Sequence, residues 1–373
     1  MTAMLRPAAD RCPGLLRLHL AADGALVRIK VPGGRMTGRA WQVVAGAAAR
    51  FGDGDVALTG RGGLQIRGIR PGPGGAAPDE LVGTVVAAGL LPSRTHDRVR
   101  SILCSPLTGR VGGRADLRPV VDRLDALLCA DPELAALSGR FLFTVDDRGD
   151  LAGLPGDLGV RALDRGTVRL RIGALAGERV PVTDAAAALV ALAHRFLAVR
   201  GDAWQVRDLP GRGVELGGRP LPAESAGTAD PAPAPGLLVQ RDGHHAVVAL
   251  APLGLVDPAR SAAVVRAAAA GGDRLVVTPW RSVVVADLPA GRSAEVLDTL
   301  GAAGWVVDPA SGWRGVTACT GAPGCVRSAG DTRTPARSLA AARRPTDLPV
   351  HVVGCERRCG VPAGPHRELR VTG

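Results

Sequence analysis

Residues 23–71 read DGALVRIKVPGGRMTGRAWQVVAGAAARFGDGDVALTGRGGLQIRGIRP, and residues 242–289 read DGHHAVVALAPLGLVDPARSAAVVRAAAAGGDRLVVTPWRSVVVADLP. Each stretch predicts a strand, a turn with proline and glycine, a helix, and then two strands close together. Thr37 is expected to open the first helix, and Asp257 with Pro258 the second, because these residue types favour the first positions of a helix. Similarity over so long a period is typical of a duplicated unit whose copies bury their apolar faces together.

The duplication continues beyond these two stretches. RVRSILCSPLTGR (98–110) follows the first copy and WRGVTACTGAPGC (313–325) follows the second, so that Cys104 takes the place of Cys319. The Pro/Ala-rich stretch AESAGTADPAPAPG (223–236) has no hydrophobic periodicity and predicts a linker between the two halves. We therefore expect an α+β protein of two pseudo-equivalent halves. Thr183-Asp184 is expected to cap the helical run AAAALVALAHRFLAVRG that follows.

Four cysteines near the end of the chain form two pairs, a C-x5-C pair (Cys319 and Cys325) and a C-x3-C pair (Cys355 and Cys359). Four thiolates from two short glycine-rich loops suit zinc or an iron–sulfur cluster. Structural zinc usually has two to four residues inside each pair, which argues against zinc here. A cubane cluster is larger and has four cysteine thiolates as its standard ligands. Disulfides or buried structural thiols are the alternative.

The amino-acid composition indicates in which cellular compartment the protein works and whether it contacts a membrane. Seven cysteines in 373 residues, an odd number, argue against a secreted disulfide scaffold. The first twenty residues lack the apolar core of a signal peptide, and no stretch approaches the roughly 18 uncharged apolar residues of a membrane span. A cytoplasmic protein without membrane contact is expected.

The net charge of +11 comes almost entirely from arginine, because Lys30 is the only lysine. The arginines are spread along the chain, tyrosine is absent, and there are only four phenylalanines and five tryptophans. Nucleic-acid binding would favour a clustered basic face with stacking aromatics, so no nucleic acid is expected. An anionic small substrate uses arginine equally well, since the guanidinium group pairs bidentately with carboxylates.

Three signatures resemble the nitrite and sulfite reductase superfamily. RIKVPGGRMT (28–37) followed by TGRGGLQIRG (59–68) is similar to its ferredoxin-like half-domain, RSILCSPL (100–107) to its arginine-containing loop, and the cysteine pairs to its cluster motif. The resemblance implies two ferredoxin-like half-domains in pseudo-two-fold arrangement, each followed by an α/β domain, around a central macrocycle.

The resemblance divides the chain into five parts. They are the first half-domain (1–75), an α/β domain without a cluster (76–222), the linker (223–236), the second half-domain (237–300) and a [4Fe–4S] cluster domain (301–373).

Within the superfamily, CPGLLRLHLAADGALVRIKVPGG (12–34) and GCERRCG (354–360) resemble the precorrin-3B synthases. Sirohaem reductases are longer and tend to have small residues or Pro-Asn inside the last cysteine pair, where this chain has Glu-Arg-Arg. They also place two lysines in the stretch similar to GRFLFTVDD (139–147), where this chain has Arg140 and Leu142. These departures favour a related tetrapyrrole, bound as substrate, over sirohaem.

The resemblance also assigns site residues, although no catalytic residue. The cluster ligands would be Cys319, Cys325, Cys355 and Cys359. The residues facing the macrocycle and its acetate and propionate groups would be Arg61, Gln65, Arg100 and Arg140. Arg61 and Gln65 are expected on either side of the turn into an edge strand. Alternatively, each arginine is an ordinary solvent-exposed side chain in an arginine-rich protein.

Three glycines in the cysteine loops are expected to donate backbone hydrogen bonds to cluster sulfur, or only to shape the loops: Gly321, Gly324 and Gly354.

The implied activity is that of an oxygen-dependent oxidoreductase of aerobic cobalamin biosynthesis, a monooxygenase that converts precorrin-3A to precorrin-3B by ring hydroxylation and lactone formation. It implies dioxygen, a [4Fe–4S] cluster and a mononuclear non-haem iron, for which no ligand triad can be read from the sequence. No nucleotide-binding fingerprint is visible, so the electrons are expected from an external donor protein. The alternatives are a sirohaem-type nitrite or sulfite reductase and a non-catalytic metal-binding protein.

Overall fold

Both copies of the repeat form the predicted unit of a strand, a turn, a helix and two closely spaced strands. The structure, a computed structural model, describes residues 10, 12–221, 232–362 and 364–372. The first copy consists of β2 (Gly24–Ile29), β3 (Arg35–Thr37), α1 (Gly38–Phe51), β4 (Val56–Leu58) and β5 (Leu64–Ile69). The second consists of β12 (His245–Leu250), β13 (Leu255–Val256), α5 (Pro258–Ala269), β14 (Arg274–Val277) and β15 (Ser282–Leu288). The duplication inferred from the sequence is therefore confirmed element by element.

The predicted starts of the two repeat helices are also confirmed. The Thr37 side chain accepts a hydrogen bond from the Ala40 amide, and the Asp257 side chain accepts one from the Arg260 amide. These bonds satisfy amide groups that have no partner within the helix. The prediction for α4 (Ala185–Val199) is half right: the helix starts as expected, but the Asp184 side chain makes no capping hydrogen bond. A short 3-10 turn, Val182–Asp184, leads into the helix instead.

The two half-domains exchange one short strand each. The first sheet has the order β1-β2-β5-β4-β13, with β1 at His19–Ala21, and the second has the order β11-β12-β15-β14-β3, with β11 at Gly236–Val239. Thus β3 of the first copy pairs with β14, and β13 of the second copy pairs with β4. The order also corrects one expectation: β5, which carries Gln65, lies between β2 and β4 and is not an edge strand.

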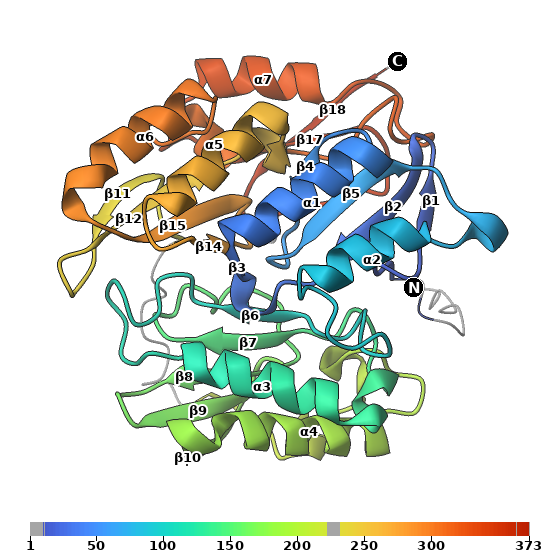
Figure 1. Cartoon of the computed structure of the whole chain (residues 1–373). Coiled ribbons are helices and arrows are strands. Elements are labelled where there is room, and N and C mark those ends of the chain that lie inside the picture. Colours follow the sequence, from blue (N-terminus) through green and yellow to red (C-terminus); the bar gives the residue numbers. More distant parts are fainter. Residues whose placement is uncertain (1–9, 11, 222–231, 363, 373) are drawn as a thin grey trace.

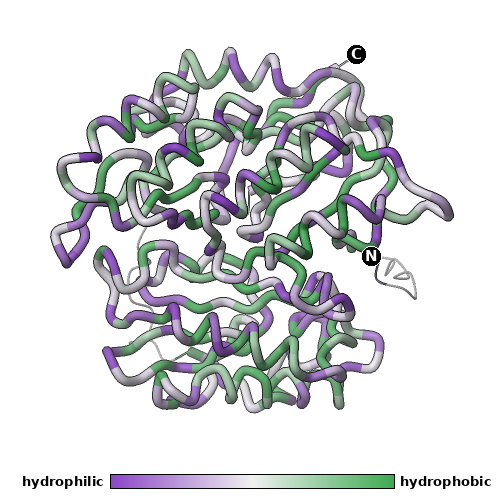
Figure 2. The backbone as a smooth tube through the Cα atoms, viewed as in Figure 1, coloured by the Kyte–Doolittle hydropathy of each residue, from purple (hydrophilic) through white to green (hydrophobic). Residues whose placement is uncertain are grey.

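One hydrophobic core lies beneath both half-domain sheets. It combines Trp41 and Val44 of α1 with Val264 and Ala267 of α5, and α1 and α5 pack against each other. The helices α2 (Asp79–Ala87) and α6 (Ser293–Ala302) extend this layer. Figure 2 shows hydrophobic stretches along the interior strands and hydrophilic outer turns. The two halves therefore form one packed body.

A third sheet lies below this body in Figure 1. Its order is β10-β9-β8-β7-β6, in which β6, β7 and β8 run parallel and β8, β9 and β10 antiparallel. The strands are β6 (Ile102–Cys104), β7 (Phe143–Asp146), β8 (Leu158–Ala162), β9 (Thr167–Ile172) and β10 (Leu175–Pro181). They are accompanied by α3 (Arg118–Ala130) and α4.

The stretch Val182–Val199, which contains α4, is long and apolar enough to cross a membrane by length and composition alone, and 33% of it is buried in the protein. The core helix of a water-soluble domain passes the same test. Leu189, Ala193 and Phe196 of α4 are fully or almost fully buried in the core of the third sheet. Packing against the core of the third sheet therefore explains the apolar side of α4.

A fourth, smaller sheet of three parallel strands ends the chain, with the order β16-β17-β18. Its elements are β16 (Val316–Ala318), α7 (Arg333–Ala342), β17 (Val350–Val353) and β18 (Arg367–Arg370). Of the expected linker at 223–236, residues 223–231 lie outside the described residues.

Candidate cluster and macrocycle site

The four predicted cluster cysteines follow two neighbouring parallel strands. Cys319 comes directly after β16, and Cys355 comes two residues after β17. Since Ala318 pairs with Val352 in a parallel ladder, the ends of both strands meet at one edge of the sheet, where the loops that follow bind ligands in many such sheets. The structure thus brings the two cysteine pairs to the same edge.

The thiols are close enough to influence one another. Burial raises the pKa of the Cys359 thiol, the nearby Arg357 guanidinium lowers it, and the negative charges of Cys355, Cys319 and Cys325 raise it further. Cys359 is the exposed member of the set, and the other three are half-buried.

Backbone contacts hold the cysteine loops in place. The Gly354 amide donates to Cys319 Sγ at 3.3 Å, as predicted for one of the three loop glycines. A Cβ at Gly354 would lie 1.8 Å from Ser328 Oγ, so the loop closes only with glycine there. His351 is fully buried, and its two ring nitrogens contact Thr317 Oγ1 at 2.8 Å and the Cys359 carbonyl at 3.2 Å. His351 therefore fastens the last cysteine loop to the sheet.

The donor set suits a [4Fe–4S] cubane, whose standard ligands are four cysteine thiolates. Among the described residues, no three His, Cys, Asp or Glu side chains are placed to hold one metal ion. The same observation leaves the expected mononuclear iron without a ligand triad in the described part of the chain.

A central cavity of about 590 Å³ opens between all four sheets. The first half-domain contributes Gly60, and the second contributes the loop with Trp280 and Arg281. The third-sheet domain contributes the loop from Asp150 to Pro155, and the cluster domain contributes Trp313 and the backbone that follows Cys359, starting at Gly360. Such a cavity, largely apolar with a few polar groups, is the usual form of a small-molecule site.

A smaller and strongly basic cavity of about 300 Å³ shares Gly60 with the central cavity. Its lining residues include Arg28, Lys30, Arg61 and Arg100. Lys30 Nζ donates to Ser101 Oγ at 2.7 Å. Burial lowers the pKa of Lys30 to about 7, and the charges of Arg61 and Arg28 lower it as well. Positive groups are thus crowded around this cavity.

The four residues predicted to face a macrocycle are only partly brought together. Arg61 lines the basic cavity, and its Nη1 donates to the carbonyls of Gly139 at 3.3 Å and Arg140 at 2.9 Å. Gln65 lies beside this cavity, where its Oε1 accepts from Arg28 Nε at 3.3 Å. The Arg140 guanidinium lies over the ring of Trp204, 5.1 Å from its centre.

Arg100 also lines the basic cavity, but its guanidinium is already occupied. Nε and Nη2 donate to the two carboxylate oxygens of Asp125 at 2.7 Å each, and Nη1 donates to the Leu90 carbonyl at 3.2 Å. In this arrangement Arg100 fastens α3 to the loop before β6.

Sequence reasoning missed four residues that line the two cavities: Arg28, Lys30, Trp280 and Arg281. A signal for two of them existed, because Lys30 is the only lysine and Arg28 stands two residues before it in the motif RIKVPGG. The other two could have been found by comparing TGRGG (59–63) with TPWRS (278–282), where the second copy has Trp280 in place of Arg61 and Arg281 in place of Gly62.

Three aspartates at the end of β7 and in the loop after it are buried, Asp146, Asp147 and Asp150, and Asp150 lines the central cavity. Ser105 Oγ donates to Asp150 Oδ1 at 2.6 Å, and Asp150 Oδ2 is buried without a hydrogen-bond partner among the described residues. Burial raises the pKa of Asp150 to about 6, the Ser105 hydrogen bond opposes the rise, and the charge of Asp146 adds to it. Asp150 is therefore a carboxyl group that holds its proton to a higher pH than usual.

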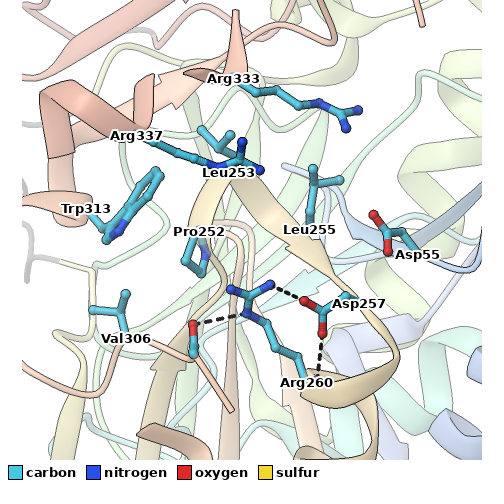
Figure 3. A pocket seen from close by; sticks show the side chains of 11 residues that line it. Asp55, Pro252, Leu253, Leu255, Asp257, Arg260, Val306, Trp313, Arg333 and Arg337 are labelled. Atoms are coloured by element: carbon cyan, nitrogen blue, oxygen red, sulfur yellow. Dashed lines mark hydrogen bonds and ion pairs between the residues drawn. The ribbon is translucent and has the colours of Figure 1, made fainter. Parts of the chain in front are cut away.

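Another cavity, of about 290 Å³, lies beside the central one and shares Leu253 and Trp313 with it. Figure 3 shows Arg260 held between Asp257 and the Gly304 carbonyl, while Arg333 and Arg337 of α7 enter from the opposite side. Leu253 and Trp313 thus separate a small polar cavity from the central one.

Comparisons with known proteins bear on this arrangement. Residues 19–72 match the family model described as the nitrite/sulfite reductase ferredoxin-like half domain. No curated protein sequence matches the chain significantly. Among solved structures, the NirA protein of Mycobacterium tuberculosis is similar with a TM-score of 0.70 and 20% identity, over 89% of this chain and 68% of the NirA chain. The chain therefore contains a stretch that matches a nitrite/sulfite reductase ferredoxin-like half domain, and it has the duplicated α+β fold of NirA over most of its length.

Proposed function

We propose that this chain is a redox enzyme that binds a carboxylate-bearing tetrapyrrole in the central cavity, beside a [4Fe–4S] cluster held by Cys319, Cys325, Cys355 and Cys359. The observation that carries the proposal is the position of the cavity between all four sheets, with the backbone after Cys359 in its wall. Within this class, the specific reaction we propose is the oxygen-dependent conversion of precorrin-3A to precorrin-3B, in the cytoplasm.

The cavity walls suit a flat, anionic ligand. Two of only five tryptophans in the chain, Trp280 and Trp313, line the cavity, and aromatic rings bury large flat surfaces well. The adjoining basic cavity presents Arg28, Lys30 and Arg61, which suit the acetate and propionate groups on the rim of a tetrapyrrole.

The residues have distinct roles in this proposal. A [4Fe–4S] cluster, when bound, supplies electrons one at a time. Arg28, Lys30 and Arg61 bind and orient the carboxylates of the substrate. Asp150 holds a proton on Oδ2 at the cavity wall below about pH 6, because Ser105 occupies Oδ1. Hydroxylation by dioxygen consumes two electrons and two protons and releases water, so a proton donor at the cavity is needed.

Two further requirements follow from the reaction. The electrons come from a separate donor protein, because the chain has no nucleotide-binding motif in a strand–turn–helix context. Cys359, as the exposed cysteine, marks the side of the cluster nearest to solvent. Neither nucleic acid nor a membrane has a part in the proposal.

The test is a cofactor inventory on anaerobically purified protein, followed by a turnover assay. We expect about four irons and four acid-labile sulfides per chain and a broad brown absorption. With precorrin-3A, a reductant and dioxygen, the product should gain one oxygen atom by mass spectrometry. Absence of turnover in cluster-loaded protein would contradict the specific reaction.

A second candidate is a sirohaem-dependent nitrite or sulfite reductase, which the likeness to the NirA fold favours. A strong Soret band in the purified protein, together with reduction of nitrite or sulfite, would establish it. One zinc per chain without iron or sulfide would instead indicate a non-catalytic metal-binding protein.

A further inference from the structure

Arg281 stands where the first copy of the repeat has a glycine. In both copies a threonine hydroxyl accepts from the backbone amide four residues later, Thr59 from Gly63 at 3.2 Å and Thr278 from Ser282 at 3.3 Å. In both, the third residue after the threonine donates its amide to the threonine carbonyl. That residue is Gly62, at 3.1 Å, in the first copy, and Arg281, at 3.3 Å, in the second.

This position requires a left-handed backbone. φ is +63° at Gly62 and +59° at Arg281. Glycine adopts this conformation without penalty, whereas a residue with a Cβ is strained in it. Strained residues persist where the surrounding structure holds them, and they concentrate at ligand sites. The second copy thus places an arginine where local geometry favours glycine.

The charge of Arg281 has no counterpart within the described protein. Arg281 is half-buried, whereas two fully buried arginines are paired bidentately, Arg100 with Asp125 at 2.7 Å and Arg110 with Asp287 at 2.8 Å. Arg281 makes no side-chain hydrogen bond or ion pair with any described residue, and burial lowers its pKa without an opposing carboxylate. An enclosed charge without a partner is costly, so a ligand anion would relieve it.

The Arg281 side chain lies at the central cavity, where such an anion would bind. Arg281 lines the central cavity beside Trp280. A Cβ at Gly254 would lie 2.8 Å from Arg281 Cδ, and a Cβ at Gly360 would lie 3.3 Å from its Nη2. Two glycines therefore make room for the arginine, and the second of them directly follows Cys359. The guanidinium lies on the side of the cavity that belongs to the last cysteine loop.

We propose that Arg281 binds a carboxylate of the ligand in the central cavity, on the side next to Cys359. This inference rests on the proposed function, because it takes the ligand to be a tetrapyrrole with carboxylate side chains. It adds a binding residue in the central cavity to Arg28, Lys30 and Arg61 of the adjoining basic cavity.

The experiment exploits the strained backbone. Arg281→Gly should leave the thermal midpoint unchanged or raise it, because glycine suits the left-handed position, while removing the cation. Arg212→Gly is the matched control, since Arg212 has φ +51°, is exposed and lines neither the central nor the basic cavity. The probe is uroporphyrin, a stable octacarboxylate tetrapyrrole, titrated by fluorescence into cluster-loaded protein with iron content as the check of integrity.

We expect Arg281→Gly to bind uroporphyrin about 10- to 100-fold more weakly than the wild type, and Arg212→Gly to bind it equally well. Arg281→Lys should recover part of the loss, because it keeps the charge without the bidentate geometry. Arg281→Gln, which keeps the strained backbone and a polar side chain without the charge, should bind as weakly as Arg281→Gly.

The possible outcomes test the role of Arg281 and the proposed function separately. Equal affinity in wild type and Arg281→Gly would overturn the role of Arg281 and leave the proposed function standing. No binding of uroporphyrin to the wild type would overturn both. A second arm with nitrite identifies the anion: loss of nitrite binding in Arg281→Gly, with uroporphyrin binding intact, would assign Arg281 to a small oxyanion and overturn the carboxylate assignment.

Discussion

Lys30, the only lysine of the chain, combines a half-buried position with two arginine neighbours. Burial, with Arg61 and Arg28 nearby, lowers its pKa from 10.5 to about 7. Between these two pH values the unfolded chain binds a proton that the folded protein does not, so this group makes folding more favourable as the pH rises from about 7 to 10.5. A carboxylate placed beside Lys30 would raise its pKa again, because an opposite charge favours the protonated form.

We therefore expect tetrapyrrole binding at pH 8 to take up close to one proton. Calorimetric titrations in two buffers with different ionisation enthalpies measure the uptake. Lys30→Met should abolish most of it and weaken binding most below pH 7, where the wild-type lysine is charged before the ligand arrives. Undiminished uptake in Lys30→Met would show that another group is responsible.

The cysteines allow a matched comparison within the chain. Cys319→Ser and Cys355→Ser should each lose iron and acid-labile sulfide, because a cubane that lacks one thiolate is labile. Cys104, the counterpart of Cys319 in the first copy, is buried at the end of β6, and burial raises the pKa of its thiol. Cys104→Ser and Cys129→Ser should retain the full iron content. Iron loss in Cys104→Ser would place a metal in the first half instead.

Arg61 and Arg100 should respond differently to truncation although both line the basic cavity. Arg100→Ala leaves Asp125 without its bidentate partner and is expected to lower the free energy of unfolding by about 3 kcal/mol. Arg61 pairs only with backbone carbonyls, so Arg61→Ala should cost less stability and weaken tetrapyrrole binding by about 10- to 100-fold. Chemical denaturation and ligand titration of both variants check this, and the reverse ranking would show that Arg100 is the binding residue.

At the level of elements, the exchanged strands β3 and β13 tie the halves together. Each half-domain sheet has an outer strand that belongs to the other copy. An isolated half would lack that strand and expose an unpaired edge, which promotes aggregation. We expect chains divided within 222–231 to yield soluble protein only when both fragments are co-expressed, and to co-elute in size-exclusion chromatography. Soluble, monomeric fragments from separate expression would contradict this.

Local patterns allowed the repeat units and the two capped helices to be predicted from the sequence, because turn residues, periodicity and spacing determine them. The strand exchange could not be predicted, since β3 and β13 have three and two residues and pair with strands more than 190 positions away. The position of β5 inside the sheet, and not at its edge, depends on the same long-range pairing. The Arg100–Asp125 pair escaped prediction because a side-chain partner on α3 leaves no trace in the motif around Arg100.

For the whole molecule, the central cavity has walls from all four sheets, although no single repeat encloses it. A ligand bound there contacts both half-domains, the third-sheet domain and the cluster domain at once, so its binding energy favours the assembled state of every part. The duplicated copies differ at the turn before their last strand, with Arg61 beside the basic cavity in one and Trp280 beside the central cavity in the other.

A tetrapyrrole at 100 times its Kd should accordingly raise the free energy of unfolding by about 2.7 kcal/mol. Because each domain contributes to the cavity wall, the ligand should shift every thermal transition of the protein to higher temperature. Differential scanning calorimetry with and without uroporphyrin measures this, and Arg212→Gly should shift as the wild type does. A shift confined to one transition would mean that the ligand is held by one domain alone and that the central cavity is not its site.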